Sequence, residues 1–332
     1  MILSSCQSSD STESMLDNYL YRLRNSLQVD EPLQDVQQAL GQDLQAYPRR
    51  RELLHTIPPA SINLLEFLRL SSCDLQRHIG QRNSSLGSLM KGSQRLVYEY
   101  EFIRLAEKCL VQIGTDDSLY PVLKDVLIDK YKQLPKIKWN AIAASEEFST
   151  LFSLGSQPLS QAAIKENPIE LYTAIDTLKR FSAEKLNDYS KVEAAYGILV
   201  SSKYIGELRL SMQLLVRYMS IADSLLDKRI HVKPLCFSGK SNKRSAIVEA
   251  VFLKFYIGEV QPYIAGLNQQ AKKTFKQMDD LIDGLDSVPA FDRFWLDIYK
   301  SEGSEWQQFN QAISRHTKQW QQLLTQCGRL PA

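Results

Sequence analysis

Three carboxylates lie close together in the C-terminal part of the sequence. Asp279 and Asp280 are adjacent, and Asp283 follows three residues later. Carboxylate oxygens are ligands that Mg²⁺ prefers, and a bound Mg²⁺ can neutralise the charge of a diphosphate leaving group. The spacing is therefore compatible with a magnesium-dependent enzyme that acts on a diphosphate.

The helical register around these carboxylates argues against that chemistry. The cluster resembles the acidic motif of isoprenoid synthases, which are all-α enzymes, and this similarity implies a metal-dependent activity as an alternative. With Met278 at heptad position a and Leu281 at d, however, the three aspartates fall at b, c and f, away from the apolar seam. Metal-binding aspartates must face a cavity, so we expect a solvated acidic face. The same register predicts that Asp223 and Asp227 belong to such a face.

Other catalytic arrangements are not indicated. The four histidines are His55, His78, His231 and His316, and they include no HExxH pattern and no pair at metal-ligand spacing. The Gly-x-Ser-x-Gly pattern of a nucleophile elbow is also absent from the sequence. We therefore expect no cofactor and favour a non-enzymatic protein over an enzyme.

The N-terminal tetrapeptide Leu3-Ser4-Ser5-Cys6 has the form of a bacterial lipobox. In such a signal the cysteine becomes the mature N-terminus and carries lipid. A signal peptide also needs a basic region and about 7–15 apolar residues before its cleavage site, and only Met1 and Ile2 precede Leu3. Lipidation of Cys6 therefore requires a start upstream of Met1. The alternative is a chance match in a cytosolic helical scaffold.

The other cysteines form an even set. Of the five cysteines, all except Cys6 lie within the body of the chain: Cys73, Cys109, Cys236 and Cys327. In an oxidising compartment four cysteines allow three pairings. Proximity in sequence favours a bridge between Cys73 and Cys109. A bridge between Cys236 and Cys327 is favoured because both fall near predicted helix ends or loops.

This pairing is not determined by the predicted helices. A simple hairpin that turns near Leu86 would place Cys73 opposite Tyr100 and not opposite Cys109. Four buried free thiols, which behave as small apolar side chains, remain the alternative to two bridges.

Two basic segments are candidates for binding an anion. The first contains six cations and no acidic residue: Lys228, Arg229, Lys233, Lys240, Lys243 and Arg244. It could meet anionic lipid headgroups, lipopolysaccharide phosphates or an acidic partner, although a solvated linker between two helices is the simpler explanation. The second is Arg49, Arg50 and Arg51. If Pro48 begins a helix, these cations occupy the end that the helix dipole disfavours, so we expect them to pair with carboxylates or bind an anion.

Composition and periodicity predict an all-α protein. The 332 residues include 14 glycines and 12 prolines, about 4% each, whereas the average usage is about 7% and 5%. Apolar residues recur at helical spacing, and strand-like alternation is absent. A net charge of +2 argues against a nucleic-acid-binding protein. No stretch approaches the roughly 18 apolar residues of a transmembrane helix, so membrane contact is expected through a lipid on Cys6 or a surface patch.

The C-terminal half has the strongest heptad pattern. One apolar seam consists of Ile205, Leu208, Met212, Leu215, Met219, Ala222 and Leu226. It predicts one long helix over about residues 189–228. A second seam follows a predicted kink at Pro262, and separate helices are expected on the two sides of Pro135. We predict an elongated multi-helix bundle, with a lipobox remnant and tether over 1–10, a helical subdomain over 11–155 and a long-helix bundle over 156–332, or one continuous domain.

Several segments, mainly in the N-terminal third, resemble one family of proteins. They are Leu3–Cys6, Tyr47–Leu53, Cys73, Arg82–Gly87, Ser93–Leu96 and Cys109-Leu110. The chain is similar to domain-of-unknown-function family 3080, predicted lipoproteins of Gram-negative bacteria. The resemblance implies a lipidated envelope protein, supports a bridge between Cys73 and Cys109, and implies no activity. Gln7, in place of aspartate, resembles an outer-membrane sorting signal. We therefore expect a protein on the periplasmic face of the outer membrane that binds a protein partner or an envelope polymer.

Overall fold

The computed structural model describes residues 11–30, 40–58, 64–84, 89–185, 188–237 and 239–329. Within these ranges every regular element is a helix and no strand occurs. This confirms the predicted all-α fold. The predicted lipobox and Cys6 lie outside the described residues.

The described helices vary from single turns to long rods. The N-terminal half contains α1 (Thr12–Leu27), α2 (Arg50–Leu53), α3 (Leu64–Arg69), the 3₁₀ turn η1 (Leu70–Ser72), α4 (Asp74–Arg82), α6 (Gly92–Ile113), α7 (Tyr120–Ala141), α8 (Glu146–Thr150) and α9 (Gln161–Lys165). The C-terminal half contains α10 (Ile169–Ser182), α11 (Tyr189–Ser201), α12 (Tyr204–Asp227), η2 (Lys228–Val232), α13 (Lys243–Val251), η3 (Phe252–Val260), α14 (Gln261–Ile282), α15 (Pro289–Trp295), η4 (Leu296–Lys300) and α16 (Glu305–Gln326). The segments η2, η3 and η4 are π-helical.

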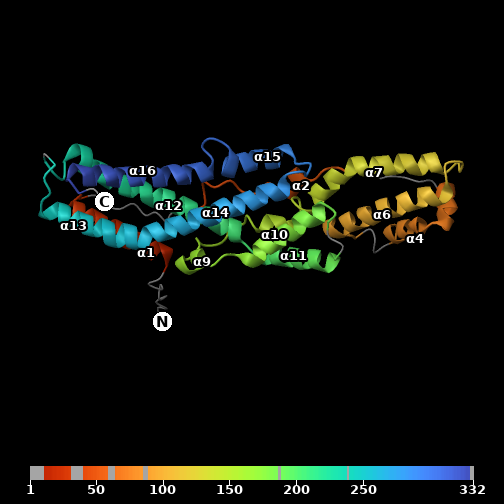
Figure 1. Ribbon diagram of the computed structural model, residues 1–332, viewed down its shortest axis with the longest axis horizontal. Helices are drawn as coiled ribbons and strands as arrows, with labels where there is room; N and C mark the ends of the chain where they lie inside the picture. Colours follow the sequence, from red (N-terminus) through yellow and green to blue (C-terminus); the bar gives the residue numbers. More distant parts are fainter. Residues whose placement is uncertain are drawn as a thin grey trace.

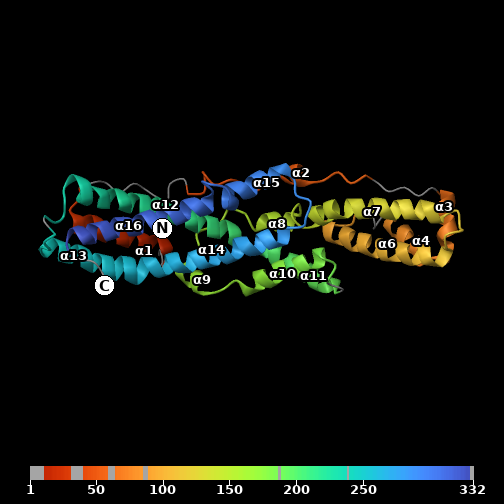
Figure 2. The same cartoon turned by 45° about the horizontal axis from the view of Figure 1, so that its top comes forward.

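The molecule is elongated, and different helices form its two ends (Figure 1). At one end α6 packs along α7, and α4 packs against α6. At the other end α12 lies beside α16, with α1, α13 and α14 completing a bundle; the rotated view in Figure 2 shows the same grouping. The helices α10 and α11 lie between the two ends (Figure 1).

The two predicted apolar seams are buried in this bundle. In α12 the side chains of Ile205, Leu208 and Leu215 are inaccessible to solvent, and in α14 the same holds for Leu267 and Met278. Apolar residues at alternating spacings of three and four stay on one side of a helix, so each seam can bury a continuous stripe. The local pattern therefore identified the core faces of both helices.

The long helix predicted over residues 189–228 is instead divided into α11 and α12. Ser202 is extended, which ends α11, and α12 begins at Tyr204. The segment that follows α8 crosses α12 at Gly206, whose N–H donates to the Leu151 carbonyl at 2.8 Å. A Cβ on Gly206 would lie 1.9 Å from the Ser153 carbonyl oxygen. This close crossing explains why a glycine stands at the start of α12.

Both prolines lie within continuous helical segments, so the separate helices predicted on the two sides of Pro135 are wrong. Pro135 lies inside α7, which continues through it; Leu134 and Ile137 are buried on each side of it and hold the helix in place. At Pro262 the helical path also continues, because the π-helical η3 directly precedes α14, in which Pro262 occupies the first turn. A widened turn accommodates a prolyl ring that has no N–H to donate.

Candidate functional site

The first basic segment connects α12 to α13 at the end of the long axis (Figure 1); it consists of η2, a loop and the first two residues of α13. We call this segment the basic tip; it comprises residues 228–237 and 239–244, with the cations Lys228, Arg229, Lys233, Lys240, Lys243 and Arg244. Asn242 caps α13, since its side chain accepts from the Ser245 N–H at 2.9 Å. The six predicted cations therefore lie on η2, on the loop that follows it and on the first turn of α13.

Buried contacts hold the basic tip to the end of the bundle. The Cα atoms of Cys236 and Cys327 are 5.1 Å apart, and their sulfur atoms lie at disulfide distance, 2.07 Å. Leu235 is buried beside them. Its N–H donates to the Arg229 carbonyl at 3.0 Å, and its carbonyl accepts from the Asn242 side chain at 2.9 Å. A loop anchored in this way presents its remaining side chains in a defined arrangement.

Large apolar side chains stand out from the same loop. Val232 is 76% exposed and Phe237 is 75% exposed, on the two sides of the buried Leu235 and Cys236. Lys233 is exposed as well. The tip therefore combines cations with apolar groups that are accessible to a partner.

Three lysines of the tip are not neutralised by a carboxylate of the described residues. Within the described parts of the chain, Lys233, Lys240 and Lys243 have no carboxylate at ion-pair distance. The Nε of Arg229 is shielded from solvent and has no hydrogen-bond partner among the described residues. Burial, and then the neighbouring Arg244 guanidinium, lower the pKa of Arg229. An anion bound here would relieve the repulsion between the two guanidinium groups.

The second basic segment lies elsewhere. Arg50 and Arg51 belong to the single-turn helix α2, which Figure 1 places near the middle of the molecule and away from the tip. The Arg49 N–H donates to the Glu52 carboxylate at 2.9 Å, and Arg50 lies 3.9 Å from Glu146 in an exposed pair. The three arginines are exposed, and Arg49 and Arg50 line a surface depression of about 500 Å³. The two basic segments therefore do not form a common patch.

Two of the three carboxylates in the acidic cluster are paired with lysines. Asp279 lies 2.5 Å from Lys300 Nζ and accepts from Trp295 Nε1 at 3.0 Å. Asp280 lies 3.2 Å from Lys276 and 3.8 Å from Lys179. Together with Asp283 these carboxylates line a depression of about 380 Å³. Among the described residues, no group of three potential ligands is arranged to hold a metal ion.

Asp223 does not belong to a solvated face, and that prediction was wrong. The carboxylate is buried between α12 and α16, where it accepts from His316 Nδ1 at 2.6 Å and from Arg315 Nε at 2.8 Å. The other ring nitrogen of His316 lies 2.8 Å from the Tyr19 hydroxyl, which in turn accepts from Trp320 Nε1 at 2.9 Å. Heptad position e is a flanking position, and here α16 covers it.

This network is a structural unit of the bundle. Tyr19, His316 and Trp320 are almost completely inaccessible to solvent, so a substrate cannot reach them in this conformation. Burial lowers the pKa of His316 despite its hydrogen bond to Asp223, and burial raises the pKa of Tyr19 well above its usual value. The ring is therefore neutral, and the hydroxyl keeps its proton.

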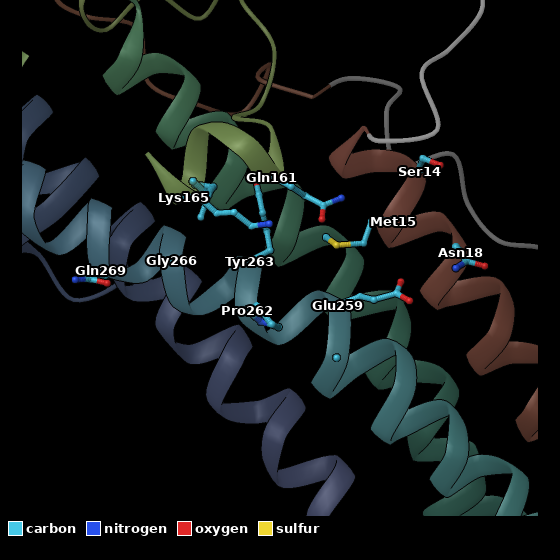
Figure 3. A pocket seen from close by; sticks show the side chains of 12 residues that line it. Ser14, Met15, Asn18, Gln161, Lys165, Glu259, Pro262, Tyr263, Gly266 and Gln269 are labelled. Atoms are coloured by element: carbon cyan, nitrogen blue, oxygen red, sulfur yellow. The ribbon is translucent and has the colours of Figure 1, made fainter. Parts of the chain in front are cut away.

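A groove lies where α1, α9 and α14 meet, with a volume of about 820 Å³ (Figure 3). Met15 comes from α1, Gln161 and Lys165 from α9, and Glu259 from η3 (Figure 3). Gly266 permits this junction, since a Cβ there would lie 2.3 Å from Ile164 Cγ2. The walls are mainly polar and carry no pair of groups arranged for acid–base or nucleophilic work.

The second cysteine pair lies at the opposite end of the molecule. The Cα atoms of Cys73 and Cys109 are 5.5 Å apart, and their sulfur atoms are 2.04 Å apart, which is disulfide distance. A simple hairpin about Leu86 does not describe this end, because α6 begins only at Gly92. The later start shifts the register, so that Cys73 at the beginning of α4 meets Cys109 in place of Tyr100.

Fold and site together define an elongated, all-α protein. It has a cysteine pair at each end and a basic tip at one of them. A family model matches residues 16–331. The chain therefore belongs to DUF3080, a family described as protein of unknown function. Comparisons with curated proteins and with solved structures gave no match. None of the described helices is long and apolar enough to cross a membrane.

Proposed function

We propose that this protein is a lipid-anchored protein of the bacterial envelope that binds a partner or an envelope polymer and does not catalyse a reaction. Cys6 would carry the lipid and hold the chain on the periplasmic face of the outer membrane. The helical body would then act as a rigid support for its binding surface.

The observation that carries this proposal is the pairing of the four other cysteines. Cys73, Cys109, Cys236 and Cys327 are all buried and lie at disulfide distance in two pairs. Disulfides persist in oxidising compartments such as the periplasm. Since each of these thiols has a partner, Cys6 is the one cysteine left for acylation.

The accessible surfaces support a binding role. The basic tip is a preorganised, charged surface, whereas the accessible carboxylates Asp279 and Asp280 are neutralised by lysines. The Asp223 and His316 pair has the groups of a general base but is closed off by the bundle.

Palmitate labelling tests the proposal. In Gram-negative cells that express the protein from its own gene, we expect incorporation of labelled palmitate into wild type and none into Cys6→Ser. A Cys236→Ser/Cys327→Ser variant serves as the control and should keep the label. Labelling that persists in Cys6→Ser, or its absence from wild type, would contradict the lipid anchor.

A further inference from the structure

The basic tip carries two features that a single ligand class can satisfy. Its cations Lys233, Lys240 and Lys243 are exposed without carboxylate partners among the described residues. Its apolar side chains Val232 and Phe237 are each about three-quarters exposed. A membrane interface offers phosphates for the cations and an apolar region directly beneath them.

We infer that the basic tip docks on an anionic lipid bilayer, with its cations at the level of the phosphates and with Val232 and Phe237 inserted below them. The inference rests on the proposed binding role and assigns that role a ligand class. It does not require the lipid on Cys6, so the two can fail independently.

The position of the tip fits a planar surface. The loop between α12 and α13 lies at the end of the long axis in both views (Figure 1, Figure 2), so a bilayer can meet it without contacting the sides of the rod. The Cys236 and Cys327 pair and the buried Leu235 hold the base of the loop in place. Preorganisation of this kind reduces the entropy that docking costs.

The charge distribution favours a lipid surface over an acidic protein. The tip contains no acidic residue, and of the two carboxylates that flank it in sequence, Asp227 lies 3.7 Å from His231 and Glu249 pairs with Arg329. The tip is therefore net positive. An acidic peptide would neutralise these cations but would need apolar side chains at matching positions to bury Phe237, whereas the bilayer interface offers both properties over its whole area.

Vesicle sedimentation of the full-length, unlipidated Cys6→Ser protein tests this inference. We expect binding to vesicles that contain phosphatidylglycerol, weakening as salt rises, and little binding to pure phosphatidylcholine. In the same background, Lys233→Gln/Lys240→Gln should reduce partitioning about 30-fold, which corresponds to about 2 kcal/mol at tenfold per 1.4 kcal/mol. Phe237→Ser should reduce it about tenfold.

Matched controls separate the tip from general charge and hydrophobicity. Lys124→Gln/Lys136→Gln removes two exposed cations from α7 at the other end of the molecule, and Val111→Ser removes an exposed apolar side chain from α6. Both controls should bind like the parent. The inference fails if the tip and control variants lose binding equally, if phosphatidylcholine binds as well, or if the parent is retained by polyglutamate and not by anionic vesicles. That last outcome would indicate an acidic protein partner.

Discussion

The Asp223 carboxylate is held in the centre of the bundle by donors from α16. His316 Nδ1 and Arg315 Nε each donate to one of its oxygens, at 2.6 and 2.8 Å. Trp320 Nε1 donates to the Tyr19 hydroxyl, and that hydroxyl can donate to His316 Nε2. This sequence of donors assigns the proton of the neutral ring to Nδ1. Each buried polar group thereby has a partner, which burial in an apolar core requires.

Acid should weaken the protein through His316. Its folded-state pKa lies below the ordinary value of about 6.5 because of burial, so the unfolded chain binds the proton more readily. The stability that the neutral His316 contributes is fully present above pH 6.5 and is lost as pH falls towards the folded-state pKa. One proton corresponds to about 1.4 kcal/mol per pH unit, so the loss between pH 6.5 and 5 is at most about 2 kcal/mol.

Urea denaturation between pH 5 and 8 measures this loss. His316→Gln should be less stable at every pH but should show a smaller slope below pH 6.5. His231→Gln changes an exposed histidine and should keep the slope of wild type. An unchanged slope in His316→Gln would mean that other groups cause the acid sensitivity.

At the scale of elements, the crossing at Gly206 determines how α11 and α12 are connected. The Gly206 N–H donates to the Leu151 carbonyl, and the Ser153 carbonyl occupies the space where a side chain would lie. Heptad spacing records which face of α12 is apolar, but it carries no information about a backbone segment that passes the end of the helix. For this reason the seam was predicted correctly and the break at Ser202 was not.

Gly206→Ala should therefore destabilise the protein. The added Cβ would lie 1.9 Å from a backbone oxygen, and forced shifts of this kind cost about 1–3 kcal/mol. Gly197→Ala is the matched control, because Gly197 lies within α11 with open space around it and alanine in a helix interior gains up to about 1 kcal/mol over glycine. Thermal melts should thus shift in opposite directions; a shift in the same direction would contradict the crossing.

At the scale of the whole molecule, one cysteine pair stands at each end of the rod. Cys73 and Cys109 join α4 to α6, separated by 36 residues in the chain, whereas the separation for Cys236 and Cys327 is 91. The pair of Cys236 and Cys327 connects the basic tip to the end of α16. If both bridges form, the ends of the elongated fold are covalently closed.

Removal of the bridges should have unequal effects. In the chain-entropy model, a bridge between Cys236 and Cys327 contributes about 4.6 kcal/mol because it closes the longer loop. A bridge between Cys73 and Cys109 contributes about 3.8 kcal/mol. The corresponding double serine variants should therefore lower the free energy of unfolding in that order, as measured with guanidinium chloride. Intact-mass measurement of the exported protein should show the loss of four hydrogen atoms, two for each bridge; four free thiols would contradict both bridges.

The sequence by itself determined the properties that depend on neighbours along the chain. Helical periodicity identified the all-α fold and the buried faces of α12 and α14, and the run from Lys228 to Arg244 marked the basic tip. Cysteine parity indicated two pairs. The helical periodicity is local, since each N–H of a helix bonds to the carbonyl four residues earlier. Cysteine parity is a count that needs no knowledge of the fold.

Only the tertiary structure decided which distant side chains meet. Tyr19 and His316 are 297 residues apart in the chain and 2.8 Å apart in space, and they make Asp223 a core residue although its heptad position predicted exposure. The same packing exposes Phe237 and buries Cys236 beside it. Burial of a polar group depends on what covers it and on which donors that cover supplies, and neither is recorded in the spacing of one helix.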